Sequence, residues 1–85
     1  MPLLSSFLGI AIAMYDNDHS PPHFHSRYGD FDVTVRLADG WVEGRSPRRA
    51  LALVLEWYSL HEAELLEAWN LARERRPLRR IDPLE

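Results

Sequence analysis

Hydrophobic and polar residues alternate along the first half of the chain, and this pattern predicts β-strands. Bulky and small side chains alternate over residues 7–15, and apolar and polar side chains alternate most regularly over residues 31–38. Because successive strand residues point to opposite faces of a sheet, each segment turns one face toward a core. Shorter segments at residues 23–28 and 41–44 complete a predicted four-stranded antiparallel meander.

Two pairs of residues containing glycine predict the hairpins between the last three of these strands. Gly29-Asp30 and Asp39-Gly40 both favour a two-residue loop, because glycine accepts the positive φ that such loops require. If both loops are this short, the register of each hairpin follows. These registers bring opposite charges together across the strands: Arg27 with Asp32, and Arg36 with Glu43.

The second half of the chain has the apolar spacing of two helices. Ser46-Pro47 predicts the start of the first, with serine as N-cap and proline in the first turn. Ser59 and Glu62 have the spacing of a capping box, which predicts a second helix that ends before Pro77. Leu66 is among the positions expected to be buried, and the tail after Pro77 is expected to dock on the sheet. The predicted fold is therefore α+β, with two C-terminal helices packed on one face of the meander.

Length and composition limit the functions that need to be considered. The 85 residues suffice for a single domain, 1–85, and 46% hydrophobic with 27% charged residues is typical of an ordered globular protein. The absence of cysteine excludes disulfide frameworks and thiolate zinc sites. No apolar run is long enough to span a membrane, and the apolar N-terminal segment lacks the basic start of a signal peptide. These features predict a cytoplasmic protein with no membrane partner.

The predicted registers divide the sheet residues between two faces. The face toward the helices carries the apolar set: Phe24, Tyr28, Phe31, Val33, Val35, Leu37 and Val42. The opposite face carries a polar and aromatic set: His23, His25, Arg27, Asp32, Thr34, Arg36, Trp41 and Glu43. Two alternating histidines beside two arginines are unusual on a solvent-facing sheet, so this face is the first candidate for function.

The most concentrated chemistry lies at residues 16–25, where three of the four histidines fall within seven positions. Imidazole titrates near neutral pH, so two histidines can take and return one proton without a metal ion. Arginines beside them can stabilise a phosphorane-like transition state. On this interpretation the protein is a metal-independent ribonuclease that needs no cofactor, with catalytic residues His23, His25, Arg27 and Arg36, and with His19 and Trp41 in binding roles.

Two other interpretations of the same segment stay open. The first is a metal-dependent hydrolase or nuclease, because a His-x-His pair on a strand with a further histidine or carboxylate can bind a divalent ion. Its ligands would be Asp18, His19, His23 and His25. The second is a structural cluster on a non-enzymatic interaction module, in which hydrogen bonds from Asp18 and His19 merely fix the loop.

Arg48 and Arg49 form a second candidate site. Arginines in the first turn of a helix oppose the helix dipole, which favours anions at that position. Together with free backbone N–H groups they would bind a phosphate or a carboxylate. The alternative is pairing with a neighbouring acid such as Glu43 or Asp39. This helix start is expected at the same end of the sheet as the 16–22 loop.

Over nearly its whole length the chain resembles the small bacterial proteins of the domain of unknown function 4160 family. The residues that carry the resemblance are the Phe7, Gly9 and Ile10 strand, the block Asp18-His19-x-Pro21-Pro22-His23-Phe24-His25, Tyr28-Gly29, Gly44 with Pro47-Arg48-Arg49-Ala50, and Trp57, Leu65, Trp69 and Ala72. The resemblance implies a compact α+β protein, commonly encoded beside another small protein. Such pairs are often proposed to be toxin–antitoxin modules.

Taken together, the residues and the resemblance lead to an expected function. It is the toxin-like component of a type II toxin–antitoxin pair, which acts on RNA through the histidine and arginine face. The expected partners are a small antitoxin-like protein encoded next to it and RNA. Because the net charge is −3, RNA would have to be bound by a local basic patch rather than by the whole surface.

Overall fold

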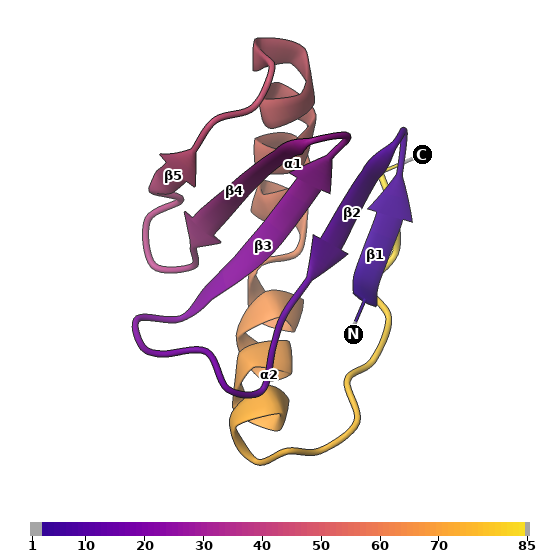
Figure 1. Ribbon diagram of the computed structural model, residues 1–85. Helices are drawn as coiled ribbons and strands as arrows, with labels where there is room; N and C mark the ends of the chain where they lie inside the picture. The colour runs from indigo at the N-terminus through magenta and orange to yellow at the C-terminus, as the bar shows by residue number, and fades with distance from the viewer. Residues whose placement is uncertain (1–2, 85) are drawn as a thin grey trace.

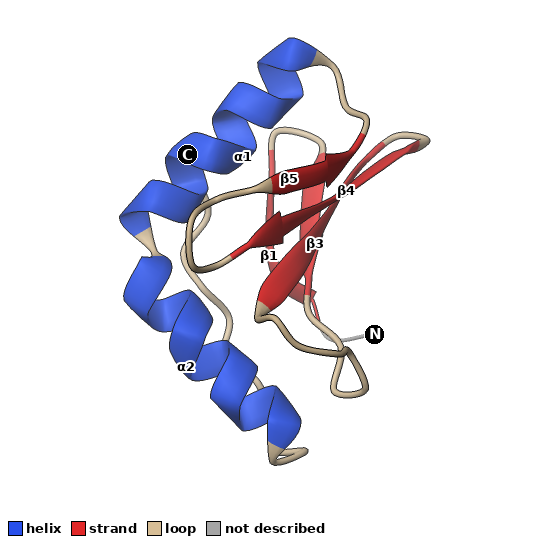
Figure 2. Cartoon of the chain, turned by 90° about the vertical axis from the view of Figure 1, so that its left-hand side faces the viewer, coloured by secondary structure: helices blue, strands red, loops and turns tan. Residues whose placement is uncertain are grey.

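The computed structural model describes residues 3–84, which form a five-stranded antiparallel sheet with two helices on one face (Figures 1 and 2). The fold is α+β, as expected, with a meander topology in which each strand pairs with the next along the chain. The sheet has five strands where four are predicted. The elements are β1 (Leu3–Phe7), β2 (Ile10–Ala13), β3 (His23–Tyr28), β4 (Phe31–Arg36), β5 (Val42–Gly44), α1 (Arg48–Leu60) and α2 (Glu62–Arg73).

The additional strand arises at the N-terminal end of the sheet. The segment predicted as one strand over residues 7–15 instead folds back after Phe7, so that β1 and β2 form a hairpin. Leu8 and Gly9 connect them, with φ values of 51° and 83°. A positive φ is sterically costly for leucine, and Leu-Gly is therefore not a usual turn signal. The hairpin could not be predicted from the residues at the turn for this reason.

One predicted hairpin register is confirmed and the other is wrong. His23 lies opposite Arg36 and Arg27 lies opposite Asp32, as the Gly29-Asp30 loop predicts. In the next hairpin, however, Glu43 lies opposite Thr34 instead of Arg36. The loop there is longer, because the N–H of Gly40 donates to the carbonyl of Arg36 at 2.8 Å, leaving four residues between the paired positions. The register changes by two residues, so every side chain keeps its predicted face.

Asp39 explains the longer loop. Its carboxylate accepts hydrogen bonds from the guanidinium of Arg36 at 2.6 and 2.8 Å and from the backbone N–H of Trp41 at 3.1 Å. From α1, the hydroxyl of Tyr58 donates to the carbonyl of Leu37 at 2.7 Å. These side-chain hydrogen bonds add to the backbone bond from Gly40 to Arg36, and the longer loop replaces the type I′ turn that Asp39-Gly40 favours.

Both helices are present, but the expected serine caps are not used. Pro47 precedes α1 with a ψ of 143°, and no side chain caps that helix. Ser59 belongs to α1 and donates to the carbonyl of Glu56, so it cannot start α2. His61 separates the two helices, and its Nδ1 lies 2.6 Å from the carboxylate of Glu64.

The core lies between the sheet and the helices, with Trp57 of α1 fully buried at its centre. The ring of Trp57 packs against those of Phe7 and Phe24, with centroids 5.7 and 5.6 Å away. Three residues expected in the core are exposed instead: Tyr28, Phe31 and Leu66. Tyr28 and Phe31 flank the protruding Gly29-Asp30 turn, whereas Leu66 lies on the side of α2 turned away from the core.

The C-terminal tail docks as predicted. Ile81 is buried, and its N–H donates to the carbonyl of Leu4 at 2.8 Å, so the tail runs beside β1 (Figure 1). The indole N–H of Trp57 donates to the carbonyl of Asp82 at 2.9 Å. Within residues 3–84, neither helix has the length and apolar character that a membrane crossing requires.

Candidate metal centre and adjoining groove

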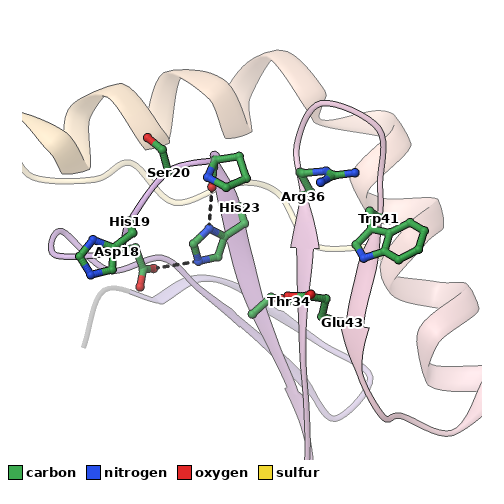
Figure 3. Close-up of a pocket in the computed structure, with 9 residues that line it drawn as sticks. Asp18, His19, Ser20, His23, Thr34, Arg36, Trp41 and Glu43 are labelled. Atoms are coloured by element: carbon green, nitrogen blue, oxygen red, sulfur yellow. Dashed lines mark hydrogen bonds and ion pairs between the residues drawn. The ribbon is translucent and has the colours of Figure 1, made fainter.

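Three side chains converge at the start of β3, on the sheet face that the helices leave open. His23 and His25 are alternate residues of β3. Asp18 comes from the loop that precedes the strand, and Figure 3 shows its carboxylate beside the ring of His23. Their side chains are one-fifth to one-third exposed. A site of this kind is held in place by the protein yet remains open to a small ligand.

The carboxylate of Asp18 is the meeting point of the group. Its Oδ2 lies 3.0 Å from Nε2 of His25 and 3.5 Å from Nε2 of His23. One nitrogen or oxygen atom from each of the three residues lies within 4.8 Å of the others. Two imidazole nitrogens and one carboxylate oxygen at these separations form a set that can bind a divalent ion.

The ring of His23 faces a hydrogen-bond acceptor on both sides. Its Nδ1 lies 2.8 Å from the carbonyl oxygen of Pro21, and a carbonyl can only accept, so Nδ1 carries the hydrogen. In the neutral ring Nε2 then has a lone pair, and that lone pair faces the Asp18 carboxylate. Two acceptors repel each other unless a proton or a metal ion lies between them. The same oxygen of Asp18 also lies within hydrogen-bond distance of Nε2 of His25, at 3.0 Å.

Aromatic neighbours fix the two imidazole rings. The ring of His25 stands edge-on to that of Tyr15, with centroids 4.8 Å apart, and Ala13 lies opposite His25 in the neighbouring strand. The ring of His23 contacts that of Trp69 in α2, with centroids 5.5 Å apart. The small side chain of Ala13 leaves room for the ring of His25. Because each imidazole ring packs against an aromatic ring, both are held in place before any ligand binds.

A groove of about 430 Å³ extends from these residues across the sheet. The groove is lined by the loop before β3, by the first residue of β3, and by residues of β4 and of β5 and the loop before it (Figure 3). The lining residues are Asp18, His19, Ser20, Pro21, His23, Thr34, Arg36, Trp41 and Glu43. His19 is exposed and lines the groove, but it does not belong to the convergent group.

Of the two predicted arginines, only Arg36 shares the groove with a histidine, His23. Arg27 is exposed, and its Nε donates to the carbonyl of Gly29 in the turn at the far end of the hairpin. Arg36 does line the groove, but its guanidinium is paired with Asp39. Of the four residues predicted to be catalytic, His23 and Arg36 therefore line one groove, whereas Arg27 lies at the other end of the hairpin.

The expected position of Arg48 and Arg49 is wrong. β5 runs in the same direction as β3, so it ends beside the start of β4, where Gly44 lies opposite Val33. The start of α1 therefore lies at the Gly29-Asp30 end of the sheet, away from the 16–22 loop. Arg49 there lines a hollow with Leu8 and Tyr28.

Sequence reasoning missed two neighbours of the histidines. Tyr15 and Trp69 are not among the predicted site residues, although each contacts an imidazole ring. Alternation places Tyr15 on the same side as Ala13, which is a signal for its role. For Trp69 no local signal exists, because the contact depends on how α2 crosses the sheet.

The ion pair in the groove perturbs both of its partners. The hydrogen bond from Arg36 is the main cause that lowers the pKa of Asp39 from 3.8 to about 2. The same hydrogen bond raises the pKa of Arg36. At neutral pH both groups are therefore charged, and Arg36 contributes little free positive charge to the groove.

Titration of Asp39 tests this pair. We expect the carboxyl carbon of Asp39 to titrate near pH 2 in the wild type, as followed by NMR. In Arg36→Gln it should titrate at a higher pH, although the hydrogen bond from the N–H of Trp41 remains. The folded pKa lies below the unfolded one, so the pair stabilises the loop above about pH 3.8 and loses this effect as the pH falls through about 2. A wild-type midpoint near 3.8 would show that the pair is not formed in solution.

Comparison with family models identifies the family of the chain. The model described as domain of unknown function (DUF4160) matches residues 9–70, a stretch that contains all three convergent residues. Comparison of the chain with curated proteins and with solved structures gave no match.

Proposed function

Because the chain belongs to the domain of unknown function 4160 family, whose description assigns no activity, we propose a function from the geometry alone. We propose that this protein is a metal-dependent hydrolase or nuclease. A divalent ion would be bound by Asp18, His23 and His25.

The observation that carries the proposal is the arrangement around His23. Histidines that bind metal ions usually donate the other ring N–H to a carbonyl or carboxylate, which fixes the ring and its tautomer. His23 has this arrangement, with Nδ1 toward Pro21 and Nε2 toward Asp18 and His25. A divalent ion between Nε2 and the carboxylate would remove the opposition of the two acceptors.

The ligand set favours a catalytic rather than a purely structural role. Structural zinc sites usually have four protein ligands, whereas catalytic sites have three and leave a position for water or substrate. Here three ligands converge beside an open groove. Imidazole and carboxylate together suit zinc, manganese, iron or nickel. Such an ion, when bound, polarises a phosphoryl or carbonyl oxygen and makes its water a stronger nucleophile.

The geometry supports a metal-independent ribonuclease less well. That mechanism requires one histidine on each side of the scissile bond, whereas Nε2 of His23 and of His25 both face one carboxylate. It also requires a free cation, and Arg36 is neutralised by Asp39.

A toxin-like role beside a small partner protein stays a separate prediction. It is tested by growth after induced expression of the wild type and of the His23→Ala, His25→Ala variant.

Calorimetric titration with Zn²⁺ tests the metal site. We expect one ion per chain in the wild type, and a loss of affinity of more than about 100-fold in His25→Ala and in Asp18→Asn, since even changes behind the ligands cost 10–100-fold. Manganese and nickel are titrated in the same way to rank the ions.

His19→Ala is the matched control, because His19 lies next to Asp18 in the chain and lines the groove but lies outside the group. It should change zinc affinity by no more than a few-fold. The proposal is wrong if the wild type binds no zinc, or if His25→Ala and His19→Ala bind it equally.

A further inference from the structure

The open face of the sheet carries two rows of side chains that run from the metal ligands to the edge strand. His23 lies opposite Arg36, whose N–H bonds to the carbonyl of Trp41, and these three form one row. The second row consists of His25, Thr34 and Glu43. The second row crosses β3, β4 and β5, and the first ends at the residue before β5. The ends of each row therefore lie about 10 Å apart, which is two strand spacings.

Trp41 closes the far end of the groove. It is 59% exposed, whereas Trp57 and Trp69 are buried. The guanidinium of Arg36 lies over its ring at 5.9 Å from the centroid, and Asp39 fixes that guanidinium in turn. An exposed indole held beside a groove of polar groups is suited to stack a flat aromatic ligand.

The polar groups between Trp41 and the metal ligands are free to bind. Over residues 3–84 the structure gives neither a hydrogen bond nor an ion pair to the carboxylate of Glu43 or to the hydroxyl of Thr34. Both side chains lie beside each other in the groove (Figure 3). A carboxylate in this position offers two acceptor atoms to a ligand stacked on the neighbouring Trp41.

We propose that this groove binds a guanine nucleotide unit of a single-stranded nucleic acid, and this inference rests on the proposed function. The base stacks on Trp41, and its N1–H and N2–H donate to the two oxygens of Glu43. Guanine alone among the common bases presents two adjacent donors on its Watson–Crick edge, and such paired donors match a carboxylate. Because the ends of each row lie about 10 Å apart, a nucleotide whose base stacks on Trp41 has its phosphate toward Asp18, His23 and His25.

Charge determines how the two ends of the nucleotide bind. Asp18 and Glu43 are acidic, and the positive charge of Arg36 is used by Asp39. The one arginine of the groove lining is therefore already paired, so a phosphate would take the metal ion as its partner. The base end needs no metal. Guanosine should bind with or without zinc, whereas zinc should strengthen the binding of guanosine monophosphate.

NMR of the three indole N–H groups tests the inference, because only that of Trp41 is exposed to a ligand. The protein is titrated with guanosine monophosphate, and then with the adenosine and cytidine monophosphates, with and without zinc. We expect the Trp41 signal to shift and that of Trp57 to stay, whereas Trp69 contacts His23 and also reports on zinc. The guanine nucleotide should bind at least about tenfold more tightly, since hydrogen bonds to a charged group are worth 1.5–3 kcal/mol.

Two variants complete the test. Glu43→Gln keeps the shape of the side chain but removes one acceptor and the charge, so the preference for guanine should disappear. Asp32→Asn, an exposed residue on the same face but outside the groove, should leave binding unchanged. The guanine site is wrong if all three nucleotides bind equally well, or if no nucleotide shifts the Trp41 signal. Either result overturns it even if zinc binds. If guanosine shifts Trp41 but zinc does not bind at all, the base site stands and the hydrolase proposal fails.

Discussion

Trp57→Ala lowers the free energy of unfolding by about 3–5 kcal/mol, the usual cost of removing a buried tryptophan side chain. Trp57 is fully buried and contacts Phe7 of β1 and Phe24 of β3. It also holds the C-terminal tail through the bond from its indole N–H to the carbonyl of Asp82. A domain of 85 residues has a small stability margin, so this single change removes much of it.

Urea unfolding of three variants separates the contributions to this effect. Trp57→Phe keeps most of the packing and loses the hydrogen bond, so it should cost less than Trp57→Ala. Leu60→Ala is the control on the same helix, because Leu60 is 64% exposed and its loss should cost no more than about 0.5 kcal/mol. Equal stability of Trp57→Ala and Leu60→Ala would contradict the described core.

Gly44→Ala lowers the free energy of unfolding by about 3 kcal/mol, from backbone strain together with a steric clash. Gly44 has a φ of 108°, which side chains rarely tolerate. A Cβ atom there would lie 2.5 Å from the carbonyl oxygen of Asp32 and 3.1 Å from Cα of Val33. Both contacts are with the backbone of β4, which is paired on both sides and cannot move away cheaply.

Gly29→Ala is the matched control for this prediction. Gly29 also has a positive φ, of 58°, but a Cβ atom there would meet nothing within 4 Å. It should therefore cost only about 1 kcal/mol, the strain of the conformation without the clash. If both variants unfold at the same urea concentration, the close approach of β5 to β4 at Gly44 is not present in solution.

Prediction from the sequence succeeded where short-range patterns determine the structure. The Gly29-Asp30 turn gave the register of β3 and β4, and strand alternation then placed His23 and His25 together on the open face. Asp18 lies only seven residues before His25, so its approach to the histidines was within reach of sequence reasoning. The helices, their common face and the docking of Ile81 also followed from apolar spacing.

Prediction failed where a single side chain determines a turn, or where the direction of a distant strand determines the position of a site. Leu8 adopts a positive φ that its type disfavours, and the first hairpin was missed as a result. Asp39 closes a four-residue loop through Arg36 and Trp41, which competes with the tight turn that Asp39-Gly40 favours. The predicted position of Arg48 and Arg49 is wrong because β5 points in the same direction as β3. The start of α1 therefore lies at the opposite end of the sheet from the 16–22 loop.

The metal centre itself depends on both kinds of information. Its residues are a local motif, but the distinction between a proton-transfer pair and a metal site rests on where each ring nitrogen points. Nδ1 of His23 faces a carbonyl only 2.8 Å away, and Nε2 of both histidines faces Asp18. Composition and alternation cannot give these directions, because they depend on the path of the loop before β3.

The most direct test of the central claim is NMR of the four histidine rings during zinc titration, with nitrogen shifts that identify each tautomer. With one equivalent of zinc, Nε2 of His23 and of His25 should move to the shift of a coordinated nitrogen, while Nδ1 of His23 keeps its hydrogen. The rings of His19 and His61 should not change. Unchanged His23 and His25 signals at saturating zinc, or coordination by His19 or His61 instead, would contradict the account.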